Sequence, residues 1–456
     1  MFTSSFVKQT SGSARAYQEA CEWLPGGVTA NIKYFSPYPI MMEKADGAYV
    51  WDIDKNRYID YNLCYGALVL GHGHPAVNRA IQTVLNQWGT TSFGTPHALE
   101  QKMAKHLADL YPGIEKVRYT HSGMEATLLA IRLATAWTGK KKIVKFDGHY
   151  HGSFDQVLIN VHPSNSVSDA MPVTTSDSYG LSEDIVANTL VLPFNDLDRT
   201  AEFLRKHHAE IGAVILEPVQ AGYIPPDPEF LKGLREVTRE WNMVLIFDEI
   251  KTGFRVSLAG AQGYYGVSPD LTTLGKVLGG GFPVGVVGGR KDILDLCSPT
   301  RGTDILSMES GNAGEKPLFH SGTHNGHPLT LAAGWATLQL LENQSVYSAL
   351  EENTLRLRSG MEEILNRHGL NGKTVGMGSI FNLVFTDRPV RQVYDVLNSN
   401  RDLRKKLDGF LLEQGIYVKP LNRFSTSVAH TPEIMDETLE QFEKGVLKLI
   451  KQEMMV

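Results

Sequence analysis

Short apolar runs alternate with amphipathic stretches through the middle of the chain. The runs cover four to six residues each, at residues 117–120, 142–146, 189–192, 213–216 and 243–247. Between them, apolar positions recur at helical spacing in residues 125–137, 197–208 and 229–241. Continuous apolar runs of this length are typical of parallel strands covered by helices on both faces, and they are short for buried helices. The pattern predicts an α/β domain with a mostly parallel sheet.

The two flanks of this region have a different pattern. Residues 1–80 predict an arm with a helix at 15–24 and two short strands at 47–52 and 57–62. Beyond residue 328, four helical stretches enclose one strand, at residues 329–341, 346–368, 380–385 (the strand), 390–414 and 433–453. We therefore expect an N-terminal arm with part of a small domain (1–80), a large α/β domain (81–328) and a smaller C-terminal α+β domain (329–456).

Composition narrows the class of protein. The 456 residues are 42% hydrophobic and 21% charged, with a formal net charge of −6. Because this charge is negative and would repel a polyanion, we expect no nucleic-acid partner. Three scattered cysteines form no pair typical of a disulfide framework or a zinc site, which favours a reducing compartment. No apolar stretch approaches membrane-span length, and the N-terminus contains no secretory apolar region. These features predict a cytoplasmic protein without a membrane partner.

Candidate chemistry follows the predicted strands, because ligands of open parallel sheets bind at the carboxyl ends of the strands. After the first strand, the segment HSGMEA at residues 121–126 runs straight into a helix. Ser122 can cap that helix and Gly123 permits close backbone approach, which makes an anion site suited to phosphate. Taken alone it is equally an ordinary N-cap, and it matches neither GxGxxG nor GxxxxGK[ST].

The next two strands are followed by an aromatic residue and by an acid. The segment DGHYHG at residues 147–152 offers Tyr150 for stacking on a planar ligand, or as a packed loop residue. Its two histidines lack the spacing and companions of a metal site, so we expect no metal. Asp248 follows an apolar strand and can keep a ring nitrogen protonated, or it can be a solvated strand-end acid.

Lys276 stands in the apolar segment LGKVLGGG at residues 274–281. Lysines in such surroundings can act as Schiff-base nucleophiles. The alternative interpretation of Lys276 is a lysine whose side chain extends to the surface. Together the four features form a phosphate cradle, a stacking ring, an acid for a pyridinium nitrogen and a lysine for an aldehyde. These are the four requirements for holding pyridoxal 5'-phosphate.

The sequence resembles the class III (subgroup II) pyridoxal-phosphate aminotransferases, in the branch of glutamate-1-semialdehyde 2,1-aminomutase and the β-amino acid aminotransferases. The resemblance covers nearly the whole chain and is most specific in DEIKTGFR at 248–255 and LGKVLGGG at 274–281. Further matching segments are LPGGV at 24–28, GAYVWD at 47–52, GHGHP at 71–75 and AHT at 429–431. It implies fold type I, the architecture of aspartate aminotransferase.

The resemblance also implies residue roles. Lys276 would hold the cofactor and move the α-proton, and Asp248 would pair with the pyridinium nitrogen. The remaining cofactor contacts would be the ring-flanking Tyr150 and Ile250, the phosphate-binding Ser122, Gly123 and Met124, and Glu217, an acid near the site. Thr323 would reach the phosphate of a neighbouring subunit, which implies a homodimer with shared active sites.

The sequence departs from the family pattern in three places. Met124 replaces a threonine, so only its backbone N–H can bind phosphate there. The arm lacks the Pro-Val-Arg of the aminomutases, and Lys33 would be a weaker, non-bidentate substitute for that arginine or a surface lysine. Arg423 lies in a shortened C-terminal segment without the aminomutases' acid, as a carboxylate clamp or a solvated residue.

These departures favour an aminotransferase that moves an amino group between a carboxylate-bearing amine, such as a β-amino acid, and a 2-oxo acid. The aminomutase is the runner-up, and a racemase or decarboxylase on the same scaffold comes third. We expect residues 301–319 to form a gate that separates these outcomes. A nicotinamide dehydrogenase lacks support because no GxGxxG is present, and a pyridoxal-phosphate sensor would need a DNA-binding module that is not apparent.

Overall fold

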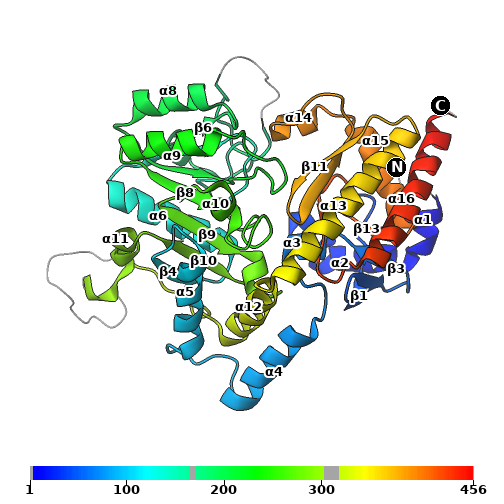
Figure 1. Cartoon of the computed structure of the whole chain (residues 1–456), viewed down its shortest axis with the longest axis horizontal. Coiled ribbons are helices and arrows are strands. Elements are labelled where there is room, and N and C mark those ends of the chain that lie inside the picture. The colour runs from blue at the N-terminus through cyan, green and yellow to red at the C-terminus, as the bar shows by residue number, and fades with distance from the viewer. Residues whose placement is uncertain (1–3, 164–170, 302–317, 455–456) are drawn as a thin grey trace. The chain divides into compact units, whose positions relative to one another are not determined.

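The computed structural model describes residues 4–163, 171–301 and 318–454, and its contacts divide the chain into two compact units. The larger unit is Arg79–Leu341 with Arg391–Tyr394. The smaller unit combines Met1–Asn78, Glu342–Val390 and Asp395–Val456 (Figure 1). The N-terminal arm and most of the C-terminal region thus belong to one unit.

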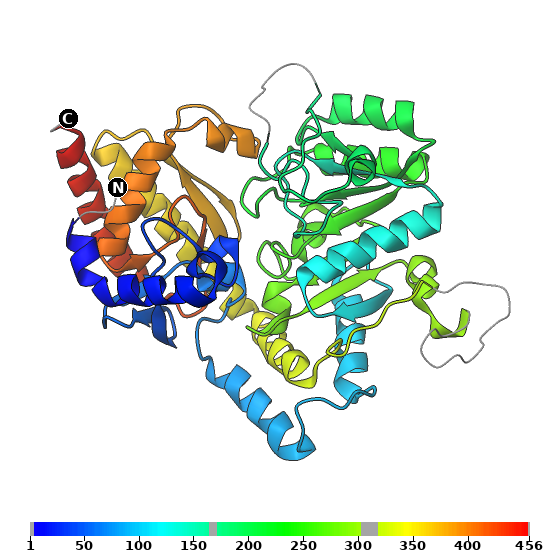
Figure 2. The same ribbon diagram turned by 180° about the vertical axis from the view of Figure 1, so that it is seen from behind.

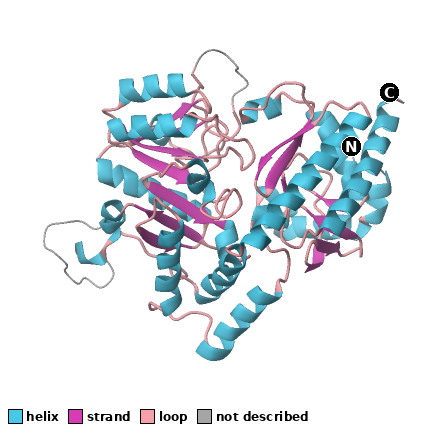
Figure 3. Cartoon of the chain, in the orientation of Figure 1, coloured by secondary structure: helices cyan, strands magenta, loops and turns pink. Residues whose placement is uncertain are grey.

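A seven-stranded sheet forms the centre of the larger unit, in the order β4-β10-β9-β8-β7-β5-β6. Its strands are β4 (Lys116–Thr120), β5 (Lys142–Phe146), β6 (Thr189–Leu192), β7 (Ile211–Leu216), β8 (Val244–Asp248), β9 (Leu271–Gly275) and β10 (Gly285–Gly289). Only β10 runs antiparallel, to both β4 and β9. The predicted mostly parallel sheet is confirmed, and Figure 3 shows its strands in magenta among helices.

Alternate residues of the central strands pack on opposite faces of this sheet. Ile215 and Ile246 pack with α6 (Gly123–Thr138) on one face. Val214 and Leu245 pack on the other face, with the helices α8 (Leu197–His207) and α9 (Phe230–Glu240). Both sets are buried, which explains why the strands are continuous apolar runs. Figures 1 and 2 show the helices that cover the sheet of the larger unit, seen from opposite sides.

The strands β9 and β10 were not predicted, because threonine and glycine replace the expected branched apolar residues. Their sequences are LTTLG and GVVGG, yet every residue of both is buried. A Cβ atom on Gly285 would lie 2.0 Å from the backbone oxygen of Ser122. Glycine is therefore required where β10 passes the loop that follows β4.

The helix α12 (Pro328–Leu341) belongs to the larger unit, although the expected domain boundary stood at residue 328. It packs on α5 (Ala98–Leu110) and on the short 3-10 helix η3 (Lys276–Gly279). The contact with η3 is close: a Cβ on Gly334 would lie 2.0 Å from the Leu278 oxygen. This backbone approach holds α12 against η3, within the larger unit.

The smaller unit contains two sheets and several long helices. One sheet has the order β1-β2-β3-β13 and the other β11-β12-β14. Its strands are β1 (Met42–Asp46), β2 (Tyr49–Asp52), β3 (Arg57–Asp60), β11 (Lys373–Met377), β12 (Ile380–Val384), β13 (Ile416–Tyr417) and β14 (Phe424–Ser425). The parallel pairing of β13 with β3 joins the C-terminal region to the arm.

The helices of this unit match the predicted amphipathic stretches closely. They include α2 (Ser11–Trp23), α13 (Gln344–Arg367), α15 (Arg401–Glu413) and α16 (Pro432–Glu453), whereas the residues of the short α14 (Val393–Leu397) are divided between the two units. A single core joins α13, α15 and α16 to the strands. Among the described residues, no helix is both long and apolar enough to cross a membrane.

Replacing Gly285 by alanine should destabilise the larger unit. The new methyl group would meet backbone that cannot move aside, and overpacking of this kind costs ~1–3 kcal/mol. Urea unfolding should therefore show a lower free energy of unfolding for Gly285→Ala. The matched control is Gly445→Ala in α16, where the nearest atom is a flexible Leu411 side-chain carbon at 3.1 Å. An unchanged stability of Gly285→Ala would contradict the close approach.

Candidate functional site

The candidate residues of the larger unit gather at the carboxyl edge of its sheet. Parallel strands end at the same edge, so the residues after β4, β5, β7, β8 and β9 become neighbours. Ile250, on the loop after β8, is close to two of these segments: a Cβ on Gly123 would meet its side chain at 2.7 Å, and one on Gly275 would meet it at 3.5 Å. Ile250 therefore lies close to both the segment after β4 and the residue before Lys276.

Ser122 caps α6 as predicted. Its Oγ accepts a hydrogen bond from Glu125 N at 3.2 Å, and a Glu125 carboxylate oxygen accepts one from His121 N at 2.7 Å. This reciprocal capping fixes the start of the helix and leaves the first-turn N–H groups of Gly123 and Met124 without intrahelical acceptors. The Met124 side chain is exposed and lies against Ser153, so only its backbone is suited to an anion.

Asp248 is 4% exposed and is held through both carboxylate oxygens. Oδ2 lies 2.7 Å from Nδ1 of His151, and Oδ1 accepts hydrogen bonds from Ile250 N and Thr273 Oγ1. A buried carboxylate is stable only with such partners. The sequence analysis considered His151 only as a metal ligand and did not predict its contact with Asp248. The one feature of the sequence that indicates this contact is a histidine on the loop after β5.

His149 is a second buried histidine on the same loop. Its Nδ1 accepts a hydrogen bond from Glu217 N at 2.9 Å, so the ring proton is assigned to Nε2. Burial lowers the pKa of His149 well below its usual value, and the ring is neutral. The Nε2 atoms of His149 and His151 are both buried without a hydrogen-bond partner among the described residues.

Glu217 follows β7 and lies 2% exposed. Its carboxylate pairs with Lys251 Nζ at 2.5 Å and accepts a hydrogen bond from Tyr150 N at 3.1 Å. Burial by itself would raise the pKa of Glu217, but the adjacent charge of Lys251 lowers it to about 2. Tyr150 as a whole residue remains 44% exposed at this edge, where its ring can flank a planar ligand. Lys251 was not predicted as a site residue.

Lys276 directly follows β9 and begins η3 with a φ of +45°, in the left-handed region. This conformation is uncommon for a residue with a side chain and typically marks a position held by its surroundings. The following glycines serve packing, because a Cβ on Gly280 would lie 2.5 Å from the Ala333 oxygen of α12. The glycine run therefore docks η3 on α12.

Thr323 is exposed in the stretch Ser321–His324, so its hydroxyl is accessible on the larger unit. Its predicted contact with a second subunit stays a prediction. Of the expected gate at residues 301–319, residues 302–317 lie outside the described part of the chain.

The two candidate substrate cations lie in the smaller unit. Lys33 is exposed, and its Nζ donates a hydrogen bond to Thr29 Oγ1 at 2.8 Å. Arg423 Nη2 donates to the backbone oxygen of Tyr65 at 3.3 Å. Both are anchored to neighbouring chain segments, and their roles toward a substrate stay predictions.

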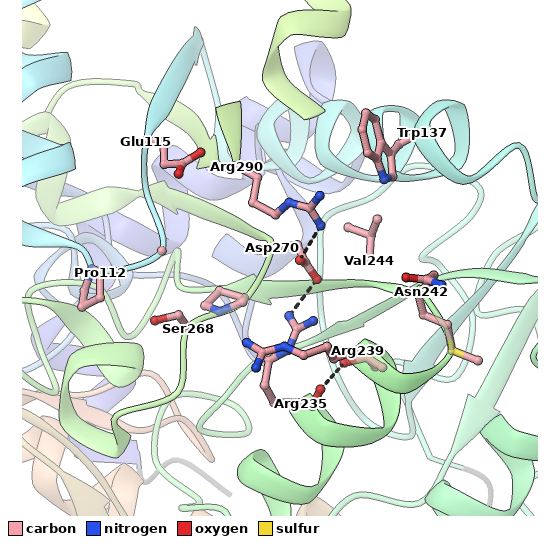
Figure 4. A pocket seen from close by; sticks show the side chains of 14 residues that line it. Pro112, Glu115, Trp137, Arg235, Arg239, Asn242, Val244, Ser268, Asp270 and Arg290 are labelled. Carbon is pink, nitrogen blue, oxygen red and sulfur yellow. Dashed lines mark hydrogen bonds and ion pairs between the residues drawn. The ribbon is translucent and has the colours of Figure 1, made fainter. Parts of the chain in front are cut away.

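A separate cavity of about 470 Å³ opens at the opposite edge of the sheet, where β8 and β9 begin (Figure 4). Arg235 and Arg290 both point to the buried Asp270, with ion pairs of 2.7 and 3.0 Å. Asp270 also accepts a hydrogen bond from Leu245 N at 2.9 Å. The carboxylate thus ties strands to a helix, and this cavity contains none of the candidate residues.

The carboxyl edge fits pyridoxal phosphate. It combines free first-turn N–H groups at Gly123, an exposed ring at Tyr150, a buried and hydrogen-bonded Asp248, and Lys276 one residue beyond β9. Within the described residues, no group of three or more His, Cys, Asp and Glu is arranged to hold a metal ion. Such an edge on a mostly parallel sheet defines a pyridoxal-phosphate enzyme of fold type I.

Comparison with known proteins gives the family. The model described as Aminotransferase class-III matches residues 33–448, and the chain belongs to this family. It is 42% identical to the glutamate-1-semialdehyde 2,1-aminomutase of Desulforudis audaxviator (strain MP104C), over 95% of this chain and 97% of the relative.

Solved structures of both predicted activities resemble the chain. An omega-transaminase from Sphaerobacter thermophilus superposes with a TM-score of 0.90 at 33% identity, covering 97% of this chain and 99% of the other. A glutamate-1-semialdehyde-aminomutase from Pseudomonas aeruginosa PAO1 superposes with a TM-score of 0.83 at 26% identity, covering 98% and 96%. The predicted family, the fold type I architecture and the pyridoxal-phosphate cofactor are confirmed.

The neutral, buried His149 should make stability depend on pH. Below about 6.5 the unfolded chain binds a proton at this histidine that the folded chain does not, so stability falls as pH decreases. In His149→Asn, which keeps an acceptor for Glu217 N, this contribution of up to ~1.4 kcal/mol per pH unit should disappear. Unfolding measured between pH 7.5 and 5.5 tests it, with the exposed His162→Asn as control. Equal slopes in wild type and His149→Asn would refute the assignment.

Proposed function

We propose that this enzyme is a glutamate-1-semialdehyde 2,1-aminomutase, the runner-up of the sequence analysis. The observation that carries the proposal is the 42% identity to a protein of that name over 95% of this chain. Two further relatives of the same name, from Methanopyrus kandleri and Methanocella arvoryzae, are 39% and 38% identical over at least 95% of the chain. The substrate would be a small amino aldehyde that carries a carboxylate.

In this proposal each candidate residue of the larger unit has its own role toward the cofactor. Bound pyridoxal phosphate supplies a carbonyl that takes up amino groups and a ring that accepts electron density. Lys276 holds that carbonyl and moves a proton at the substrate carbon, and Asp248 keeps the ring nitrogen protonated. The backbone at Ser122, Gly123 and Met124 binds the phosphate.

The flanking residues Tyr150 and Ile250 hold the ring from its two faces. Tyr150 presents an exposed ring, and Ile250 presents an aliphatic side chain that lies against Gly123. Glu217 acts indirectly, by holding the backbone of Tyr150. Thr323, which is accessible, would contact the phosphate held by a second copy of the chain in a homodimer.

An aminotransferase that uses a separate amino donor and 2-oxo acid is the second candidate. The observation that favours it is the residue in the arm: Lys33 stands where the aminomutases have an arginine, and an ammonium cannot form the bidentate pair of a guanidinium with a carboxylate. The TM-score of 0.90 with an omega-transaminase also supports it. Both activities use the same cofactor contacts.

The assay that separates these functions uses glutamate-1-semialdehyde alone. An aminomutase should convert it to 5-aminolevulinate without a co-substrate, because both amino transfers occur on one molecule. An aminotransferase should instead need a donor such as a β-amino acid and an acceptor such as 2-oxoglutarate or pyruvate. Turnover that strictly requires the second substrate would overturn the first proposal and leave the second.

Lys276→Ala should lose all turnover while the protein still folds. Borohydride should fix the cofactor covalently to the wild type at Lys276, as peptide mass spectrometry would show, and should fix none to the variant. The exposed Lys232→Ala is the control and should keep both properties. Covalent labelling at another lysine would show that the cofactor-binding lysine is misassigned.

A further inference from the structure

Lys251 is a largely buried cation at the site, and the proposed mechanism assigns no role to it. It follows Ile250 on the loop after β8, and its side chain is 14% exposed. A lysine is normally solvated, and a charge withdrawn from water needs a partner. The Lys251 partner is Glu217, whose side chain is 3% exposed at an Nζ–Oε1 distance of 2.5 Å.

This ion pair joins three strand-end loops. Glu217 comes from the end of β7, Lys251 from the loop after β8, and Tyr150 from the loop after β5. One oxygen of Glu217 binds Lys251 and the other accepts the Tyr150 N–H at 3.1 Å. The position of the Tyr150 backbone therefore depends on a carboxylate whose nearest cation is Lys251.

Lys251 also contacts the Tyr150 ring directly. Its Nζ lies 5.6 Å from the ring centroid, within the range of a cation–π interaction. The ion pair and this contact restrain the same side chain from two directions. The charged and titratable groups that face Glu217 and Tyr150 are Lys145, His149, His151, Asp248 and Lys251.

We infer that Lys251 is a positioning residue: by neutralising Glu217 and contacting the Tyr150 ring, it fixes the pose of that ring and the local charge at the cofactor. The inference rests on the proposed place of Tyr150 against the cofactor ring. It does not depend on which amino-transfer reaction the enzyme catalyses. Without Lys251, Glu217 would keep the Tyr150 N–H and the charge of Lys145 as partners, and the negative charge that it retains would favour protonation of nearby groups.

The test measures the bound cofactor without substrate in Lys251→Met, a chain of similar length without charge. The pH midpoint of the cofactor's visible absorption should rise by about one unit, at the low end for loss of an adjacent opposite charge. The dissociation constant of pyridoxal phosphate should rise about tenfold as Tyr150 loses its restraint. Lys251→Arg keeps a cation for Glu217 and should stay within about threefold of wild type.

The double variant Lys251→Met/Glu217→Gln separates charge from packing. It removes both charges and keeps an acceptor for Tyr150 N, so the pH midpoint should return close to the wild-type value. This variant also serves if Lys251→Met alone fails to fold, because it leaves no buried unpaired carboxylate. Lys232→Met on the surface is the matched control.

Two results would overturn the inference. One is a folded Lys251→Met with wild-type cofactor affinity and pH midpoint. The other is a double variant whose midpoint is shifted as far as that of the single variant, which would make the effect one of packing alone. Neither result bears on the glutamate-1-semialdehyde assay, so failure of this inference and failure of the proposed function are distinguishable.

Discussion

Two buried carboxylates, Asp248 and Glu217, impose the main constraint on this enzyme. They end adjacent strands of a parallel sheet, at 4% and 2% exposure, where an uncompensated charge would be very costly. Their partners come from other strands: His151 from the loop after β5, Thr273 from β9, and Lys251 from the loop after β8. The charges are thus stable only when the strands lie in the observed order, and that order brings the candidate residues together.

The packing of α12 against η3 restrains the backbone that follows Lys276. Gly280 and Gly334 allow η3 and α12 to approach with backbone against backbone, at separations that a Cβ atom would prevent. Lys276 opens η3 with a left-handed φ, so its backbone is held by the end of β9 on one side and by this contact on the other. A lysine held in this way needs less reorganisation to reach a fixed reaction partner.

The sequence predicted the elements well, and it predicted the contacts between them poorly. Apolar runs identify β5, β7 and β8, because a strand that is buried on both faces has apolar residues at nearly every position. The strands β9 and β10 leave no such trace, because close backbone approach requires Gly285 in β10, and the threonines of β9 form hydrogen bonds with Asp248 and Gln262. The ion pair of Glu217 with Lys251 and the contact of Asp248 with His151 join residues 34 and 97 positions apart. Periodicity along the chain contains no information on such pairs, and only the strand order reveals them.

The same division explains why the cofactor is easier to infer than the reaction. Every proposed cofactor contact within one chain lies in the larger unit, on strand ends that the sheet aligns. The residues proposed for the substrate carboxylate lie in the smaller unit, where Lys33 ends the short 3-10 helix Asn31–Lys33 and Arg423 directly precedes β14. An ammonium there offers a point charge, whereas a guanidinium offers a planar fork that orients a carboxylate. The proposed cofactor contacts of the sheet are common to both reactions, so they cannot by themselves distinguish an enzyme that retains one intermediate from one that exchanges two substrates.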